Sequence, residues 1–349
     1  MFKQILLSLI VLNTFAGPLE DQLFSVIISR QGVQAVTKAI NAGADVNAKT
    51  KYNCSVLMTH LDDYLYDEDS KEVLKLLIAA GADVNASDFN YGSALRRVIC
   101  SYNVIENGSY DINPESNSKI VWLETIKLLI AAGADVKAKI NGYTILNCAM
   151  HTNIEIVKLL ISAGADINSG RLFCSLAGGF NEKLFSMVMF LIDSGVNINE
   201  RDDSGKTALL KALKNDNVNM SSLFITVGAD VNAKDDDGKN AFFYLDTHTN
   251  DTHTYPTHHN DIVRDDTVRA KLRLLINSGA NINAKDNNGW TALMFYSKKG
   301  CTVIVEELIK AGADVNVKEI YYNWTALRYA AFFGYTKIIN LLRAAGAKE

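Results

Sequence analysis

Hydrophobic and polar positions recur along the chain in one repeated sequence motif, called the repeated phrase below. An apolar Leu-Leu-Ile run is followed by small residues and a glycine, and then by an alternating Ala-Asp-Val-Asn segment, as in LLIAAGADVNASD at 76–88. The glycines are Gly43, Gly81, Gly133, Gly164, Gly195, Gly228, Gly279, Gly312 and Gly346. Their successive separations are 38, 52, 31, 31, 33, 51, 33 and 34 residues, so the period is near 33 and two steps are longer by about 18. Such self-similarity predicts a stack of repeated units rather than one closed core.

Each copy of the phrase predicts two helices and two turns. The apolar run ends an amphipathic helix, and the glycine suits the left-handed backbone conformation that closes it. Polar tips such as DDSG at 202–205 favour a tight turn, because Asp bonds its own backbone and Gly accepts a positive φ. A threonine that can cap the next helix follows at Thr207, Thr291 and Thr325. The repeating unit is therefore turn, helix, turn, helix.

These residues resemble the ankyrin repeat, whose signature is a D-x-x-G-x-T-P-L-H-x-A turn and helix followed by a G-x-x-x-x-V-x-x-L-L-x-x-G-A-x-x-N helix and exit. The resemblance covers about residues 20–349, in about nine units with the terminal caps included. It implies a single domain over 20–349, an all-α repeat solenoid of stacked helix-turn-helix repeats with short β-hairpin-like fingers. Two positions depart from the signature: Ala or Ile replaces the proline, and residues such as Asn147 and Arg328 replace the histidine.

Three repeats are longer between their first and second helices. We expect insertions near 61–72, 101–119 and 245–266. Pro114 and Pro256 lie in the two longest, which supports these boundaries because proline is costly inside a helix. At the ends, residues 21–40 predict an N-terminal cap. Arg343 replaces an isoleucine of the other copies, as expected for a terminal repeat whose outer face is polar.

The first 16 residues differ from the repeats. Lys3 precedes an apolar run from Ile5 to Phe15, and Ala16 supplies the small residue that a signal peptidase requires. We interpret 1–16 as a secretory signal peptide, which predicts a secreted or periplasmic protein, with a cytoplasmic location as the alternative. The segment could instead be an uncleaved anchor or a first helix of the fold. Its apolar run is shorter than the ~20 residues that span a bilayer, so we expect no stable membrane insertion once it is cleaved.

Composition and motifs argue against nucleic-acid binding and against enzymatic activity. The chain is 48% hydrophobic and 21% charged, which is typical of a globular protein, and its net charge of -4 offers no basic surface for nucleic acid. The five cysteines show no metal-ligand spacing; we expect them to pack in or near helices, and export would allow one or two disulfides. The sequence has no catalytic motif and no phosphate-binding glycine loop. We therefore predict neither enzymatic activity nor a cofactor.

Four of the six histidines gather in THTNDTHTYPTHHND, residues 247–261. They are His248, His253, His258 and His259. Neutral imidazole binds Zn²⁺, Ni²⁺ and Cu²⁺, so one hypothesis is a metal- or pH-responsive binding site. The spacing matches no structural zinc template, and the Thr- and Asn-rich surroundings favour the alternative of a solvated loop. His60 and His151 are isolated, and we interpret them as helix residues.

The resemblance implies a non-catalytic scaffold that binds a protein or peptide on its concave face of fingers and inner helices. The residue before the capping threonine is the most informative on that face. With the neighbouring tyrosines, the candidate contact residues are Tyr143, Lys206, Lys239, Trp290, Tyr321, Tyr322 and Trp324. We expect Trp290 and Trp324 to stand side by side, either as an interface hot spot or as packing that only stiffens the stack. We expect the protein to be a monomer.

Overall fold

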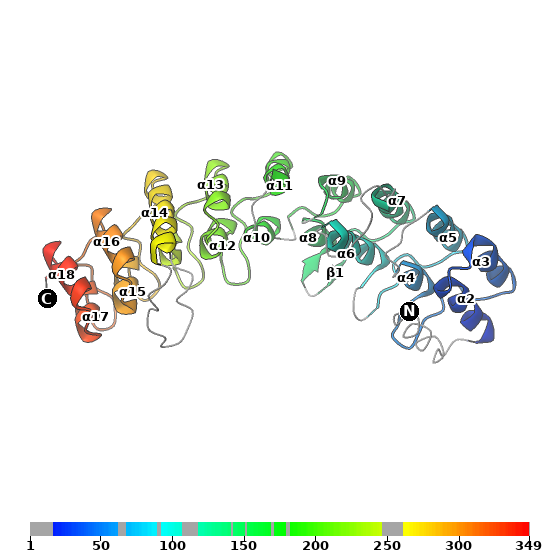
Figure 1. Cartoon of the computed structure of the whole chain (residues 1–349), viewed down its shortest axis with the longest axis horizontal. Helices are drawn as coiled ribbons and strands as arrows, with labels where there is room; N and C mark the ends of the chain where they lie inside the picture. The colour runs from blue at the N-terminus through cyan, green and yellow to red at the C-terminus, as the bar shows by residue number, and fades with distance from the viewer. Residues whose placement is uncertain are drawn as a thin grey trace. The chain divides into compact units, whose positions relative to one another are not determined.

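The structure is a computed structural model. It describes residues 17–61, 68–88, 92–106, 118–140, 142–150, 152–168, 171–178, 182–245 and 261–348. The chain divides into two compact units, Met1–Gly170 (unit 1) and Arg171–Glu349 (unit 2). Short helices in pairs build both units (Figure 1).

Unit 1 is a stack of helix pairs. The pairs are α2 (Pro18–Ile28) with α3 (Gly32–Asn41), α4 (Val56–Leu61) with α5 (Glu68–Ala79), α6 (Ala94–Glu106) with α7 (Ser118–Ala131), and α8 (Ile145–Ala149) with α9 (Ile154–Ser162). The first helices α2, α4, α6 and α8 pack on one another in one row, and the second helices α3, α5, α7 and α9 form another. The predicted N-terminal cap is the pair α2 and α3.

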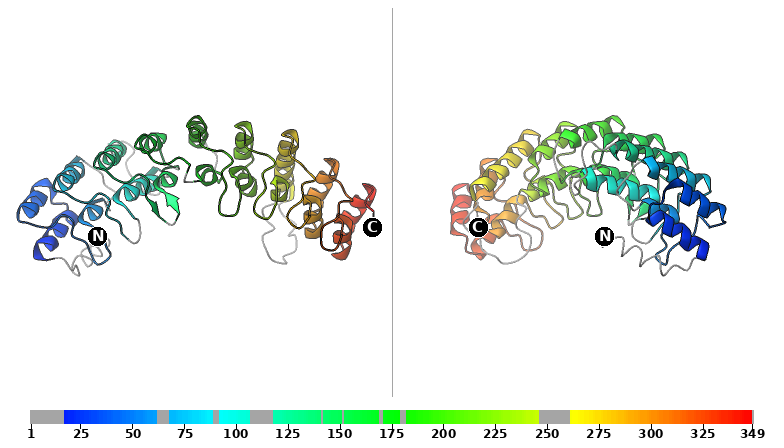
Figure 2. Two further views of the ribbon diagram at one scale, coloured as in Figure 1. Left: turned by 180° about the vertical axis from the view of Figure 1, so that it is seen from behind. Right: turned by 45° about the vertical axis from the view of Figure 1, so that its right-hand side comes forward.

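Unit 2 repeats this arrangement. The pairs are α10 (Leu172–Leu176) with α11 (Glu182–Asp193), α12 (Ala208–Lys214) with α13 (Val218–Thr226), the 3₁₀ helix η1 (Ala241–Tyr244) with α14 (Asp261–Asn277), α15 (Ala292–Lys299) with α16 (Thr302–Lys310), and α17 (Ala326–Phe332) with α18 (Thr336–Ala344). The first helices again contact one another in order from α10 to α17, and the second helices do so from α13 to α18, in two rows that Figure 2 shows from two further sides.

The repeated apolar run buries the contact between neighbouring pairs. The second position of this run is a fully buried leucine in both units, at Leu77, Leu129, Leu160, Leu191, Leu275, Leu308 and Leu342. Burying one such side chain is worth about 1.5–3 kcal/mol, and each repeat obtains that burial from its neighbour. The prediction of an all-α repeat solenoid is therefore confirmed.

Helix ends follow the predicted local chemistry. The nine phrase glycines all lie at φ between 77° and 98°, where a side chain would be strained. Thr207 accepts the N–H of Leu210 at 3.4 Å, and Thr291 and Thr325 cap α15 and α17 in the same way. Asn147, which stands in place of the signature histidine, accepts the backbone N–H of Thr144 at 3.0 Å and completes a capping box.

A short extended turn, the finger, precedes the first helix of each inner pair. One finger forms a two-stranded antiparallel ladder between β1 (Lys139–Ile140) and β2 (Tyr143–Thr144). In unit 2 the fingers that precede α12, η1, α15 and α17 are also joined, each to the next, through their backbones. These N–H to carbonyl bonds are Asp236 to Ser204 at 3.2 Å, Asn287 to Asp237 at 2.9 Å and Ile320 to Asn288 at 3.3 Å. The predicted hairpin-like fingers are present, and their bonding ties successive repeats together.

The asparagine of the repeated phrase joins one repeat to the next, a role that the sequence reasoning missed. Asn47 donates from Nδ2 to the carbonyl of Gly81 at 3.0 Å, and its Oδ1 accepts the N–H of Asp83 at 2.7 Å. Asn85 makes the same two bonds to the following repeat. In unit 2 the equivalent amide oxygens that accept a backbone N–H belong to Asn199, Asn232, Asn283 and Asn316.

One copy of the repeated phrase lacks the bridging asparagine, and restoring it is expected to stabilise the stack. Lys137 stands where the other copies carry this residue, and its ammonium group cannot accept the N–H of Asp166 in the next repeat. Lys137→Asn is expected to raise the free energy of unfolding by about 0.5–1.5 kcal/mol, the net value of a hydrogen bond. Urea unfolding followed by circular dichroism measures it. Lys137→Gln removes the same charge but has a longer side chain; equal stability of the two variants would refute the bridging role.

Parts of the predicted insertions are helical. α6 continues to Glu106, inside the predicted insertion 101–119, and α14 begins at Asp261, inside 245–266. Residues 62–67, 107–117 and 246–260 of the three insertions and the whole of 1–16 lie outside the described residues, so the signal peptide stays a prediction. Within the described stretches, no helix has the length and apolar character needed to cross a membrane.

Candidate binding surface

Aromatic side chains of the last two fingers meet on the first helix of the last repeat. Trp290 and Trp324 directly precede the capping threonines of α15 and α17. The ring of Tyr329 on α17 contacts both, with centroid distances of 4.5 Å to Trp290 and 5.1 Å to Trp324. The structure thus brings the two tryptophans to one place, and Tyr329 links them.

Two further rings enlarge this group. The ring centroid of Tyr322 lies 6.0 Å from that of Trp324, and the centroid of Phe332 lies 5.4 Å from it. We name Trp290, Tyr322, Trp324, Tyr329 and Phe332 the aromatic cluster. Tyr329 is buried and both tryptophans are half-buried, whereas Tyr322 is 74% and Phe332 68% exposed. The cluster therefore has a packed base and an exposed outer surface.

Exposed hydrophobic side chains are concentrated around this cluster. Of the eleven large exposed ones among the described residues, five fall within 320–333: Ile320, Tyr321, Tyr322, Phe332 and Phe333. Single exposed apolar residues are normal on a protein surface, but a contiguous group of them marks an interaction site.

Glu319 fixes the backbone of the finger that carries Tyr322 and Trp324. Its buried carboxylate accepts the N–H groups of Tyr321 at 2.6 Å, Tyr322 at 2.7 Å and Trp324 at 3.2 Å. Burial acts to raise the pKa of Glu319, but these backbone hydrogen bonds outweigh it and hold that pKa below its usual value. The carboxylate therefore stays ionised at neutral pH and keeps the finger in one conformation.

Two cations border the cluster. The ammonium of Lys298 lies 5.0 Å from the ring centroid of Trp290, and the guanidinium of Arg328 lies 5.6 Å from that of Trp324. Both side chains are exposed. Such cation–π contacts leave the charged groups beside the rings, where an acidic group of a binding partner can reach them.

Family comparisons agree with this architecture. The family described as ankyrin repeats (3 copies) matches residues 117–171 and 265–348, and that described as ankyrin repeats (many copies) matches residues 183–225. Together these ranges span just over half of the chain. The chain belongs to the ankyrin repeat family. Ankyrin repeats generally mediate protein–protein interaction, so the fold supports a scaffold role.

Curated proteins similar to part of this ankyrin chain include NAD-capped RNA hydrolase NUDT12 of Macaca fascicularis, Pongo abelii and Homo sapiens. Each is 39% identical over 77 residues, which is 22% of this chain and 16% of the relative. The matched segment is thus about one sixth of those proteins. The hydrolase activity in their name belongs to them, and a likeness over 77 residues gives no ground for assigning it to this chain.

Four predicted contact residues are not members of the aromatic cluster; one of them, Tyr321, is exposed and directly precedes Tyr322 in the last finger. Lys206 and Lys239 lie in earlier fingers of unit 2. The Nζ of Lys206 is 3.8 Å from a carboxylate oxygen of Asp235, and that of Lys239 is 2.9 Å from Asp237. These finger carboxylates partly neutralise both lysines. Tyr143 belongs to unit 1, where it is exposed on β2.

Sequence reasoning missed the members of the aromatic cluster that lie on α17. Tyr329 and Phe332 follow the capping threonine inside α17, where the repeat pattern predicts ordinary helix residues, and the pattern marks Arg328 only as a replacement for the signature histidine. The available signal was the spacing of Tyr329 and Phe332, since residues three apart lie on one helix face. Glu319 was also missed, although it occupies the finger position of Asp202, Asp235 and Asp286.

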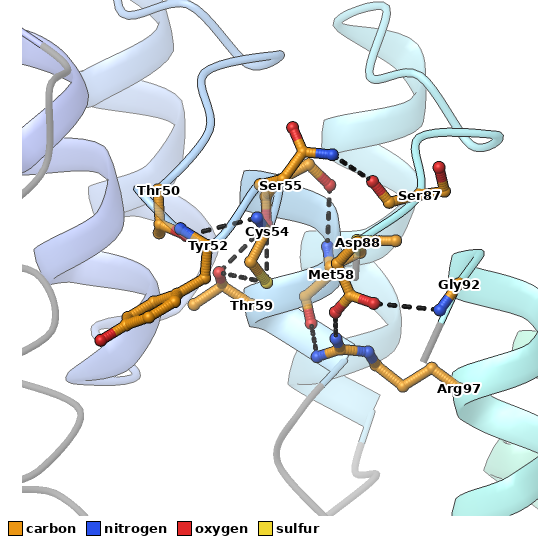
Figure 3. Close-up of polar contacts among 11 residues, drawn as sticks. Thr50, Tyr52, Cys54, Ser55, Met58, Thr59, Ser87, Asp88, Gly92 and Arg97 are labelled. Carbon is orange, nitrogen blue, oxygen red and sulfur yellow. Dashed lines mark hydrogen bonds and ion pairs between the residues drawn. The ribbon is translucent and has the colours of Figure 1, made fainter. Parts of the chain in front are cut away.

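Unit 1 carries a buried ion pair between α6 and the finger that precedes it (Figure 3). The guanidinium of Arg97 on α6 pairs with the carboxylate of Asp88, and both side chains are about 5% exposed. Asp88 also accepts the N–H of Gly92 at 2.9 Å, and Arg97 donates to the carbonyl of Met58 in the preceding repeat at 3.5 Å. This network connects a finger to the helices on both sides, which indicates a structural role.

The histidine hypothesis falls on residues outside the described part of the chain. His248, His253, His258 and His259 all lie within 246–260, so the metal- or pH-responsive site stays a prediction. Among the residues that are described, no group of three or more His, Cys, Asp or Glu could hold a metal ion. The ring Nε2 of His60 lies 2.8 Å from the carbonyl oxygen of Ser70, consistent with its interpretation as a helix residue.

Proposed function

We propose that this protein is a non-catalytic interaction scaffold that binds a protein partner through the aromatic cluster. One observation carries the proposal: exposed rings concentrate on the last finger and at the end of α17, next to the half-buried Trp290 and Trp324. Trp and Tyr are enriched among the residues that dominate binding energies at protein interfaces. The finger-to-finger bonds and Glu319 hold these rings on a rigid backbone, which lowers the entropy lost on binding.

The chemistry of the surface favours one class of partner. The rings provide an apolar contact, and the exposed cations Lys298 and Arg328 stand at their border. A protein segment that presents apolar side chains next to Asp or Glu fits both features. Charges at the rim of an interface act mainly on the association rate and its salt dependence, so we expect binding to weaken as ionic strength rises.

Affinity capture tests the proposal. The wild-type protein and the double variant Trp290→Ala/Trp324→Ala are used as baits in extracts of the native compartment, and retained proteins are quantified by mass spectrometry. We expect a specific partner to be reduced about tenfold or more with the double variant, because truncating a hot-spot aromatic costs about 2 kcal/mol or more. Phe185→Ala is the matched control, since it removes an exposed ring from α11 in the same unit.

The two variants distinguish a binding site from a general surface effect. Equal retention of the partner by the double variant and by wild type would place the binding surface elsewhere. Loss with Phe185→Ala as well would show that any exposed ring contributes. Thermal unfolding of each bait, followed by circular dichroism, identifies a variant that loses its partner through misfolding.

We also propose that the protein is exported. The apolar run at 5–15 and the small residue Ala16 support this location. The mass of the N-terminal peptide from the native source tests it: a mature protein beginning near Gly17 is expected, and an intact Met1 peptide would contradict export.

A further inference from the structure

Two cysteines from neighbouring repeats of unit 1 lie side by side. Cys100 on α6 and Cys148 on α8 are 48 residues apart in sequence, yet their side chains are close enough for each thiol to shift the pKa of the other. The two helices pack directly on each other. Both cysteines are partly accessible to solvent and neither is in a disulfide. Periodicity does not predict this pair, because the separation of 48 residues is not a multiple of the repeat period.

Arg96 is the cation of this group. It lies one helical turn before Cys100, and its Nε–H donates to the Sγ of Cys148 at 3.4 Å. The neighbouring thiol of Cys100 is the largest cause that lowers the pKa of Cys148. Burial raises that pKa, whereas the hydrogen bond and the charge of Arg96 lower it further. Together they lower the pKa of Cys148 to about 6, and Arg96 and Cys100 are the ionisable side chains that act on it.

The pKa of Cys100 moves in the opposite direction. The neighbouring thiol of Cys148 and burial both raise the pKa of Cys100, so Cys100 is the partner that keeps its proton to higher pH. Cys174 in unit 2 provides a contrast within the same protein. Burial, with the nearby charge of Glu200, raises the pKa of Cys174 to about 12, and that thiol is shielded from solvent.

We propose that Cys148 is a reactive thiolate that hydroperoxides oxidise, and that Cys100 is the thiol that resolves it to a disulfide. The arrangement supplies what such a site requires: a partly accessible sulfur, a guanidinium 3.4 Å from it and a second thiol nearby on the helix packed against it. It assigns a redox modification site to unit 1, independent of the partner surface in unit 2.

The chemistry balances with a hydroperoxide as the oxidant. The Cys148 thiolate attacks one oxygen of hydrogen peroxide, an S–O bond forms, the O–O bond breaks, and the leaving hydroxide takes a proton to become water. Cys148 is thereby oxidised to a sulfenic acid and the peroxide is reduced. The sulfur of Cys100 then attacks that of Cys148; an S–S bond forms, the S–O bond breaks, and hydroxide leaves as water with the proton from Cys100.

The disulfide would link the first helices of two successive repeats. It would join α6 to α8 and close a loop of 48 residues, which restricts the opening of this part of the stack. A thiol reductant would restore the two thiols by exchange. Unit 1 would therefore exist in an oxidised and a reduced form.

Peroxide treatment of the reduced full-length protein tests the pairing. After digestion without reductant, mass spectrometry is expected to find one dominant disulfide, between the peptides of Cys100 and Cys148. In Cys100→Ser the sulfenic acid on Cys148 should persist and react with dimedone. In Cys148→Ser neither the disulfide nor the dimedone adduct should form at this site.

Alkylation rates test the reactivity of Cys148. At pH 6 about half of a thiol with a pKa of about 6 is ionised, against about 0.3% of an ordinary thiol. Its lower nucleophilicity offsets about tenfold of that advantage, so Cys148 is expected to react with iodoacetamide about tenfold faster than Cys54 or Cys301. Arg96→Gln should reduce the excess and move the midpoint of the pH profile upwards. Arg96→Lys, which keeps the charge, should restore part of it.

Several outcomes would overturn the proposal. They are a dominant disulfide between other cysteines, unchanged dimedone labelling in Cys148→Ser, or a Cys148 alkylation rate no higher than that of Cys301. Cys54 and Cys301 are partly exposed thiols of the same molecule. Their comparison with Cys148 in the wild-type protein needs no substitution, so the test decides even where a variant fails to fold.

Discussion

Replacing Arg97 with alanine is expected to lower the free energy of unfolding by about 3–5 kcal/mol, because the change leaves a buried carboxylate without its countercharge. Arg97 is 4% exposed, and its guanidinium lies against Asp88 and the carbonyl of Met58. Water cannot readily reach Asp88 to replace the lost partner. The substitution also removes a buried hydrocarbon stem from the contact between two repeats, which adds to the loss.

Urea unfolding measures this prediction, and two variants control it. Asp88→Ala should cost a similar amount, and the double variant Arg97→Ala/Asp88→Ala should cost clearly less than the sum of the two, since it leaves no unpaired charge. Lys158→Ala breaks the exposed pair with Glu155 on α9, where an effect of about 0–1 kcal/mol is expected. A loss with Arg97→Ala as small as with Lys158→Ala would show that the buried pair does not stabilise unit 1.

The fold could be predicted because each repeat carries residues whose type is set by the local backbone conformation. A glycine such as Gly81 is needed where the chain turns with positive φ, and a threonine such as Thr291 is needed where a helix begins. These requirements are local, so they can be recognised from a few adjacent residues. Their recurrence at a spacing near 33 then implies the stack, because a single helix pair cannot bury its apolar face alone.

The contacts between repeats could be predicted only in part. Asn47 bonds to residues 34 and 36 positions later, and nothing beside it in the sequence distinguishes a bridging side chain from a turn residue. The pairing of Cys100 with Cys148 depends on how two helices of unequal repeats are aligned, and the insertion between them obscures that alignment. For the aromatic cluster, the repeat pattern predicts that Trp290 and Trp324 lie on the fingers. The contact of Tyr329 with both depends on how α17 packs against those fingers, which the pattern does not specify.

Trp324→Ala is expected to weaken binding of the partner identified by capture by about 10²–10³-fold, equivalent to about 3–4 kcal/mol. Trp324 has the most ring neighbours in the cluster, since Tyr322, Tyr329 and Phe332 all contact it. Its truncation removes a large ring and also the support of the exposed rings on either side. Titration calorimetry with the purified partner measures the change in Kd. Tyr321→Ala, an exposed neighbour in the same finger, should have a smaller effect.

Stability and affinity measured on the same variants separate the two roles that Trp324 can have. If its ring only stiffens the stack, Trp324→Ala should lower the melting temperature while leaving Kd almost unchanged, and that result would contradict a hot spot. If the ring is a contact residue, Kd should change far more than the stability does. Glu319→Ala provides the complementary case, because it leaves every ring in place and removes the carboxylate that holds the N–H groups of Tyr322 and Trp324. A rise in Kd for this variant as well would mean that the partner requires the rings in the conformation that Glu319 imposes, and that the rigidity of the finger contributes to the affinity.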